Sequence, residues 1–166
     1  DELEVPSYSD YHEVLDQVDA VSIVVPTVHH YETAKAFMEK GVHVLLEKPF
    51  AATIKEAEEL EQLSGDKNLR LQIGHLERFN SVFTEFQQLI DLPKFIENIR
   101  IAPFPKRGTD VDVILDLMIH DIDLVLAVVG EYPESVDGTG VNIVTSTADL
   151  ANARLRFPSG CIADLT

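Results

Sequence analysis

The stretch Gly41-Val42-His43-Val44-Leu45-Leu46-Glu47-Lys48-Pro49 decides the fold of this chain. Gly41 is placed to end a helix, because glycine readily adopts the left-handed conformation that follows a last helical turn. The apolar run 42–46 predicts a buried strand of a parallel sheet. Lys48 follows this strand, and it lies between the acidic residue Glu47 and Pro49. In a parallel sheet, this end of a strand faces the crevice in which ligands bind. This position indicates a chemical function for Lys48 rather than a contribution to solubility.

Helices and strands alternate along the first half of the chain. Ser9 is placed to cap the first helix, and Thr53 with Glu56 forms a capping box at the start of a later one. The predicted elements are helix 9–17, strand 20–25, helix 31–40, strand 42–46, helix 53–64 and strand 69–73. This order predicts an α/β fold with a doubly wound parallel sheet. Strand 20–25 is β-branched throughout most of its length, so we expect it to be buried on both faces.

The pattern changes after Gly74. The predicted elements that follow are helix 81–90, strand 95–101, loop 103–109, helix 112–129 and strands 135–145, 150–157 and 161–165. We therefore expect a parallel α/β half, residues 1–74, followed by an α+β half, residues 75–166, with a mainly antiparallel sheet. The chain starts before a helix and ends inside a predicted strand, so we also expect a fragment of a longer protein.

Composition excludes several classes of partner. The chain has 166 residues, 45% of them hydrophobic, and a formal net charge of −16. Such an acidic surface repels nucleic acid and anionic membranes, although a local site can still bind an anionic small molecule. No apolar run reaches the ~18 residues that a membrane-spanning helix needs. Cys161 is the single cysteine, which excludes an intrachain disulfide and fits a reducing cytoplasm.

Three predicted strands end in polar or special residues. These ends are Pro26-Thr27, Glu47-Lys48-Pro49 and Gly74-His75. The carboxyl ends of parallel strands lie along one edge of a sheet, where open α/β sheets bind their ligands. For Thr27 and His75, an ordinary loop start explains the residues equally well; for Glu47 with Lys48, a ligand site is the better explanation.

Other polar residues lie near the same predicted edge. Either His29 or His30 could line the crevice, and helix capping explains the pair equally well. Arg78 and Asn80 follow the third strand closely enough to contact a cofactor or substrate.

The predicted helix 112–129 carries a narrow polar stripe. At about 100° per residue, Asp112, Asp116, His120 and Asp123 share one face, with Asp121 on the far side of an otherwise apolar helix. A solvated face is the alternative, but such faces usually carry Lys, Glu and Gln. A carboxylate beside an imidazole suits a general base near neutral pH. Too few His or Cys residues are present for a zinc site, so we expect no metal.

One basic spot interrupts the acidic chain. Lys106 and Arg107 lie in the predicted loop before the long helix. They could contact a phosphate-bearing substrate; a solvated loop is the alternative that the sequence leaves open.

These motifs together resemble a known family. The matching segments are 18–21, 26–30, 41–49, 74–80, 116–121 and 157–160, which include Glu47-Lys48-Pro49 and the Asp-x-x-x-His pair Asp116 and His120. They resemble, in order and over nearly the whole chain, the glucose-fructose oxidoreductase, inositol dehydrogenase and MocA (Gfo/Idh/MocA) family. The resemblance implies that residues 1–74 are the C-terminal part of a Rossmann-type dinucleotide-binding domain, and that residues 75–166 begin a substrate-binding and oligomerisation domain.

The resemblance also implies a chemistry: reversible oxidation of a sugar or cyclitol hydroxyl with NAD or NADP. It assigns catalytic roles to Lys48, His120 and Asp116. Together with their position at the predicted sheet edge, the resemblance indicates a set of residues that bind the cofactor. These residues are Pro26, Thr27, His30, Glu47, Pro49 and His75. The substrate-binding set is Arg78, Asn80, Arg107 and Asp123. Family members often have a cis Lys-Pro bond and often pair subunits through the second sheet.

A narrower resemblance concerns the substrate. Segments 75–80 and 116–123 are similar to members that act on UDP-N-acetyl-hexosamines at C3. The family's glycine-rich phosphate-binding turn has no counterpart in these 166 residues, so the choice between NAD and NADP stays open. A non-catalytic sugar- or nucleotide-binding relative is the alternative function. The presence of Lys48, Asp116 and His120 favours an enzyme.

Overall fold

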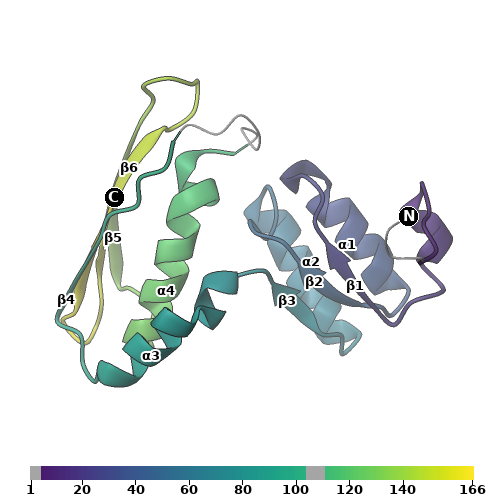
Figure 1. The fold of residues 1–166 in the computed structure, drawn as a ribbon, viewed down its shortest axis with the longest axis horizontal. Coiled ribbons are helices and arrows are strands. Elements are labelled where there is room, and N and C mark those ends of the chain that lie inside the picture. The colour runs from purple at the N-terminus through teal and green to yellow at the C-terminus, as the bar shows by residue number, and fades with distance from the viewer. Residues whose placement is uncertain (1–4, 104–110) are drawn as a thin grey trace. The chain divides into compact units, whose positions relative to one another are not determined.

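The computed structural model describes residues 5–103 and 111–166. The chain forms two compact units, residues 1–74 and 75–166 (Figure 1). Each unit has its own sheet and its own hydrophobic core. The prediction of a parallel α/β half followed by an α+β half is confirmed.

The first unit is built on a three-stranded parallel sheet. Its strands are β1 (Ala20–Ile23), β2 (His43–Leu46) and β3 (Leu71–Ile73), in the order β1-β2-β3. Ile23 pairs with Leu46, and Leu46 pairs with Ile73, so the three strands end level with one another. The predicted first helix is a short 3-10 helix, η1 (Tyr11–Val14). Its cap is Asp10 rather than Ser9, because the Asp10 carboxylate accepts a hydrogen bond from the His12 amide at 3.0 Å.

Two helices connect these strands. A short 3-10 helix, η2 (Thr27–His29), leads into α1 (His30–Glu39), and Gly41 follows α1 with a φ of +85°, as predicted. The second helix is α2 (Ile54–Asp66), and both bonds of the Thr53/Glu56 capping box are present. The core contains side chains from both helices and both long strands: Ile23, Ala34, Phe37, Met38, Val42, Val44, Leu46 and Leu60.

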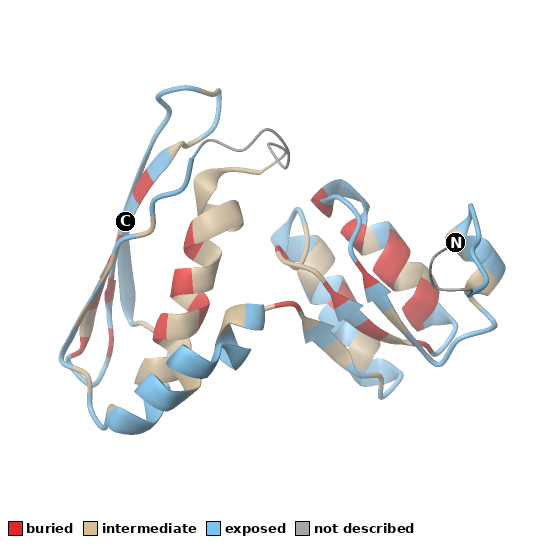
Figure 2. Ribbon diagram, in the orientation of Figure 1, coloured by how far each residue is buried: buried red, intermediate tan, exposed pale blue. Residues whose placement is uncertain are grey.

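One prediction for β1 is wrong. The strand is not buried on both faces: Ala20 and Ser22 are exposed, and Val24 just beyond them is 72% exposed (Figure 2). Leu45 on β2 is also exposed, at 41%. The reason is that α1 and α2 contribute to one core on one face of the sheet, and no described element covers the other face.

The second unit begins with helical segments. These are η3 (Leu76–Phe79), α3 (Ser81–Leu89), η4 (Ile114–Met118) and α4 (Ile119–Val129). The predicted helix 112–129 therefore starts with a π-helical segment, η4. A π turn has more residues than an α turn, so the regular spacing that predicted one polar stripe does not hold across residues 114–118.

The second sheet has four strands, β4 (Phe95–Asn98), β5 (Ser135–Val141), β6 (Leu150–Arg156) and β7 (Ile162–Leu165). Their order is β4-β7-β6-β5. The β5/β6 and β6/β7 pairs are antiparallel, as predicted, whereas β4 pairs with β7 in parallel. The strands are shorter than the sequence pattern indicated, because pairing stops before the apolar pattern does.

Helix α4 packs on one face of this sheet. Met118, which immediately precedes α4, and Val125 lie in one cluster with Leu155 of β6 and with Ala163 and Leu165 of β7. Along β6, buried and exposed residues alternate, as expected for a sheet covered on one side. Cys161 is 1% exposed in this core, and burial raises the pKa of its thiol. Cys161 therefore has a packing role in this core.

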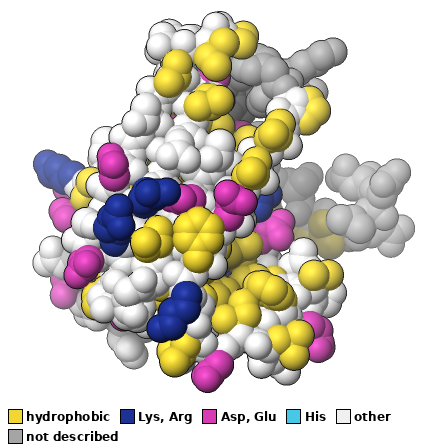
Figure 3. Space-filling view, turned by 90° about the vertical axis from the view of Figure 1, so that its left-hand side faces the viewer, with side chains coloured by type: hydrophobic (Ala, Val, Ile, Leu, Met, Phe, Trp, Pro, Cys, Tyr) yellow, Lys and Arg dark blue, Asp and Glu magenta, His cyan; other side chains and the backbone are white. Residues whose placement is uncertain are grey.

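The other face of this sheet is exposed. Charged and apolar side chains are mixed on the side of the molecule shown in Figure 3. Arg154 and Asp164 pair across β6 and β7 with both guanidinium bonds at 2.6 Å. Phe95 and Ile99, on and after β4, are 58% and 63% exposed.

Candidate functional site

The three strand ends of the first sheet lie side by side. The ladder continues one step past the strands, since the Glu47 amide donates to the Ile23 carbonyl at 3.0 Å and the Gly74 amide to the Leu46 carbonyl at 2.8 Å. Glu47 therefore lies between the end of β1 and Gly74. The predicted convergence of strand ends at one edge of a parallel sheet is confirmed for these residues.

Glu47 and Gly74 are packed closely. A Cβ atom on Gly74 would lie 3.2 Å from the Glu47 carboxylate and 3.3 Å from its Cα atom, closer than most side-chain contacts. The Glu47 carboxylate also accepts the amide of Lys48 at 3.3 Å. Glycine at position 74 is therefore what allows the acidic side chain to lie at this edge, beside the lysine backbone.

Lys48 directly follows Glu47 in the segment after β2. The Lys48–Pro49 peptide bond is cis, as the resemblance implied. Lys48 is partly buried and Pro49 is buried. Val44 and Leu46 of β2 are buried in the core, so this strand places Lys48 at the carboxyl edge of the sheet.

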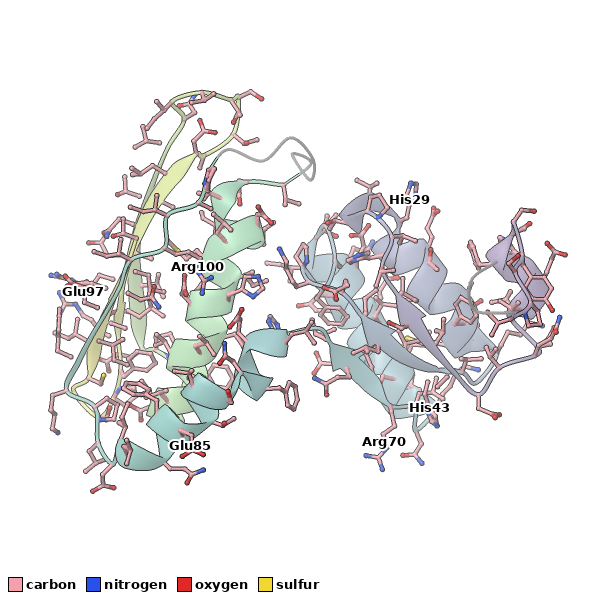
Figure 4. All side chains as sticks on the ribbon, in the orientation of Figure 1. His29, His43, Arg70, Glu85, Glu97 and Arg100 are labelled. Carbon is pink, nitrogen blue, oxygen red and sulfur yellow. The ribbon has the colours of Figure 1, made fainter. Side chains whose placement is uncertain are left out.

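His30 lies behind this edge and not on its surface. The ring is 1% exposed, with Nδ1 2.8 Å from the Pro49 carbonyl oxygen and Nε2 2.9 Å from the Val25 carbonyl oxygen. Its neighbour His29 is exposed and projects outward from the start of α1 (Figure 4). Of the other predicted cofactor contacts, Thr27 is 8% exposed, and Pro26 is exposed in the loop after β1. Contact of His30, Thr27 and Pro26 with the cofactor stays a prediction.

In the second unit, the predicted proton-handling residues lie at the start of the long helix. Asp112 caps this helix, since its carboxylate accepts the amides of Ile114 and Leu115 at 3.1 and 3.0 Å. Asp116 belongs to η4 and His120 to α4, and both are partly buried. Asp112 thus has a structural role, while the catalytic roles of Asp116 and His120 stay predictions.

A pocket of about 280 Å³ lies beside Asp116. It is lined mostly by apolar side chains, among them Leu117 of the helix and Ile143 and Val144 of the loop between β5 and β6. The carboxylate of Asp149 holds this loop together by accepting three backbone amides, those of residues 143, 144 and 145, at 2.6–2.9 Å. These bonds hold the pKa of the Asp149 carboxyl well below its ordinary range.

Two of the predicted substrate contacts bind each other. Arg78 donates from Nε and Nη2 to the Asp123 carboxylate at 2.7 and 2.6 Å, and this ion pair raises the pKa of Arg78. His75 lies at the same carboxylate, with Nδ1 4.0 Å from Oδ1 of Asp123. Asn80 caps α3 by accepting the Val82 amide at 3.0 Å. Direct substrate contact by Arg78, Asn80 and Asp123 stays a prediction, as does cofactor contact by His75.

The sequence did not indicate one buried ion pair. Asp121 is 2% exposed and accepts three bonds from the Arg100 guanidinium at 2.7–3.0 Å. Figure 4 labels Arg100 on the segment that follows β4, beside α4. A lone aspartate inside an apolar helix signals that a cation must lie opposite, but the sequence gives no means of choosing Arg100.

Some expectations lie outside what the structure describes. Lys106 and Arg107 fall within residues 104–110, which are not described. Within residues 5–103 and 111–166, no group of three or more His, Cys, Asp or Glu side chains could hold a metal ion. No helix in the same ranges is long and apolar enough to span a membrane.

Comparisons with known proteins identify the family. A family model described as "Oxidoreductase family, NAD-binding Rossmann fold" (GFO_IDH_MocA) matches residues 1–75, and the "GFO/IDH/MocA C-terminal domain" model matches residues 72–166. The chain belongs to the Gfo/Idh/MocA oxidoreductase family. The family predicted from the sequence motifs is therefore confirmed.

Two relatives of this chain in the Gfo/Idh/MocA family carry the name of a dehydrogenase. UDP-N-acetylglucosamine 3-dehydrogenase of Acidithiobacillus ferrooxidans is 41% identical over 99% of this chain and 53% of its own length. Its solved structure matches with a TM-score of 0.91, over 99% of this chain and 55% of that one. The NADP(+)-dependent scyllo-inositol 2-dehydrogenase IolW of Bacillus subtilis is 27% identical over 72% of this chain and 37% of its own length. The chain therefore spans about half the length of the UDP-N-acetylglucosamine 3-dehydrogenase.

The strand-end residues fit one part of a dinucleotide. In the Gfo/Idh/MocA family the first domain binds NAD, and ligands of such sheets lie at the carboxyl edge. Here that edge carries Lys48, Glu47 and the glycine at position 74 that makes room for the glutamate. The 166 residues contain no Gly-x-Gly-x-x-Gly turn for the pyrophosphate. Lys48, Glu47 and Gly74 therefore fit a ligand at this edge, and their contact with the nicotinamide end of the cofactor stays a prediction.

Proposed function

We propose that this chain is part of an NAD(P)-dependent dehydrogenase that oxidises a hydroxyl-bearing carbon of a sugar. The observation that carries the proposal is the position of Lys48, at the carboxyl end of the middle strand of a sheet that matches an NAD-binding family model. Residues 1–74 then form the C-terminal part of the dinucleotide-binding domain. Residues 75–166 form the start of the substrate-binding and oligomerisation domain.

The reaction needs a hydride acceptor and a proton acceptor. When bound, the nicotinamide ring would supply the acceptor for the hydride of the C–H bond at the alcohol carbon. The proton of the same hydroxyl group passes to His120 or to Lys48, and the C–O bond becomes a carbonyl. Asp116, four residues before His120, orients the imidazole or contacts the substrate. In the reverse direction the same residues return the proton.

We propose a UDP-N-acetyl-hexosamine as the substrate class. The support is the 41% identity with UDP-N-acetylglucosamine 3-dehydrogenase over 99% of this chain. The apolar pocket beside Asp116 is also of a size that accepts a small substituent of a sugar ring. Lys106 and Arg107, outside the described residues, would bind the diphosphate.

A non-catalytic sugar- or nucleotide-binding relative is the second candidate. Such a relative needs no proton acceptor at either predicted position. Lys48, Asp116 and His120 are all present in this chain, and this favours the enzyme.

We propose that the protein is cytoplasmic and forms a homo-oligomer. The outer face of the second sheet supports the oligomer, because it combines the exposed apolar side chains of Phe95 and Ile99 with the Arg154–Asp164 ion pair. A mixed apolar and charged face of this kind can pair with its own copy around a two-fold axis. The net charge of −16 argues against nucleic acid and membranes as partners.

The direct test uses the full-length protein. Formation of reduced nicotinamide is followed by its absorbance, with UDP-N-acetylglucosamine, UDP-glucose and scyllo-inositol as substrates and with NAD and NADP in turn. We expect turnover with a preference for UDP-N-acetylglucosamine. Binding of the nucleotide sugar without turnover would favour the non-catalytic relative, and equal turnover of free inositol would overturn the substrate class.

A further inference from the structure

We propose that His30 is a positioning residue that holds Lys48 in place. The inference rests on the proposed function, because Lys48 is a catalytic residue only within it. His30 itself does not reach the surface of the sheet edge, since its side chain is 1% exposed. Its influence on the reaction passes through the backbone of the residue after Lys48.

His30 connects the loops that follow two neighbouring strands. Its Nδ1 atom lies 2.8 Å from the carbonyl oxygen of Pro49, and its Nε2 atom lies 2.9 Å from that of Val25. Pro49 follows Lys48, and Val25 lies two residues beyond the end of β1. One buried ring at the first position of α1 therefore lies within hydrogen-bond distance of both the lysine segment and the loop after β1.

The lysine segment depends on this bond because of its composition. Residues 47–53 form no helix or strand between β2 and α2. Pro49 has no backbone N–H, so its carbonyl is the one backbone group through which this residue can be held. A buried carbonyl without a donor is costly. With a proton on Nδ1, His30 supplies this donor from a helix that is itself packed in the core through Ala34, Phe37 and Met38.

The chemistry of the ring guides the choice of variants. Both partners are carbonyl oxygens, so the ring bonds both at once only when both nitrogens carry protons, and one at a time otherwise. Leucine at position 30 fills a similar volume and donates no hydrogen bond. Glutamine keeps an amide donor, and so restores part of the connection. His29 is the matched control, because it is adjacent, exposed and at the start of the same helix.

The test compares His30→Leu, His30→Gln and His29→Leu in the full-length protein. For His30→Leu we expect kcat to fall by about 30- to 100-fold, the loss typical of a catalytic group displaced by about 1 Å. Cofactor affinity should change less than about threefold, since the change removes an interaction used in the reaction step. The solvent isotope effect on kcat should rise as proton transfer slows. His30→Gln should recover part of the activity, and His29→Leu should match the unchanged protein.

A second measurement is independent of activity. Hydrogen exchange followed by mass spectrometry should show faster exchange in residues 47–53 of His30→Leu, with exchange in α2 unchanged. Unchanged kcat and exchange in both His30 variants would overturn the inference, as would a loss of cofactor affinity equal to the loss of kcat. If His30→Leu does not fold, His30→Gln decides by the same criteria. Full turnover in Lys48→Met would contradict the proposed function of Lys48, and this outcome is distinct from the results for the His30 variants.

Discussion

Arg78 donates two hydrogen bonds to the carboxylate of Asp123, at 2.7 Å from Nε and at 2.6 Å from Nη2. The pair joins η3 to α4 across 45 residues of sequence. Asp123 is 8% exposed, so its charge is nearly removed from water and depends on this partner. Two residues predicted to contact the substrate therefore also hold the second unit together.

Replacing Arg78 tests that structural role. Arg78→Leu leaves the Asp123 carboxylate without its guanidinium, and we expect the free energy of unfolding to fall by about 2 kcal/mol, less than for a fully buried pair because Arg78 is half exposed. Chemical denaturation measures this change. The double variant with Asp123→Leu should lose less than the sum of the single changes. Additive losses would show that the two side chains do not depend on each other.

Gly74→Ala tests the packing at the sheet edge. The new Cβ atom would lie 3.2 Å from the Glu47 carboxylate, so Glu47 must move. We expect kcat to fall roughly tenfold, because Glu47 precedes Lys48 and a small displacement there alters the geometry of the reaction. Steady-state kinetics with the full-length enzyme measures this effect.

Gly65→Ala is the matched control for that change. No atom lies within 4 Å of a Cβ at Gly65, which belongs to α2. Alanine there should leave kcat unchanged and raise the free energy of unfolding by up to about 1 kcal/mol. Equal kinetic effects of the two alanine substitutions would contradict the assigned role of Gly74.

Lys48→Met tests the catalytic assignment. Methionine replaces the four-carbon stem with an unbranched chain of equal atom count and removes the ammonium group, so turnover should be abolished while cofactor binding is largely retained. Titration of the cofactor by fluorescence and the turnover assay give the two quantities separately. Retained turnover would show that Lys48 does not handle the proton.

The Asp149 loop gives a prediction for pH. Three backbone amides hold the pKa of Asp149 below its ordinary value of 3.8. A lowered folded-state pKa means that the stabilisation is fully present above about pH 4 and is lost as pH falls through the folded value. The melting temperature of Asp149→Asn should therefore approach that of the unchanged protein in acid and differ from it at neutral pH. A constant difference at every pH would contradict this.

Local sequence signals predicted the first unit well. The apolar run before Lys48, the capping box at Thr53 and the glycine at position 41 each act within a few residues, and each is found as expected. The burial of β1 on both faces was wrong, because an apolar pattern shows that a strand can be covered and does not show which elements cover it.

Long-range partners could not be predicted in the same way. Asp121 and Arg100 are 21 residues apart, and several other cations were equally available to the aspartate in the sequence. The π turn in η4 also has no local signature, and it interrupts the regular spacing that placed Asp112 and Asp116 on one stripe with His120. Asp112 is instead the cap of the helix, a role that its position before an apolar helix would have allowed.

The parallel pairing of β4 with β7 sets an order of events during synthesis. Phe95 of β4 pairs with Ile162, and Asn98 pairs with Leu165, so the two strands are separated by more than sixty residues of the chain. In the described sheet, β4 has β7 as its neighbour. When β4 leaves the ribosome, its neighbour has not yet been made. Strand β4 can therefore pair with β7 only after residue 165 has emerged, when all residues of the first unit have already been made.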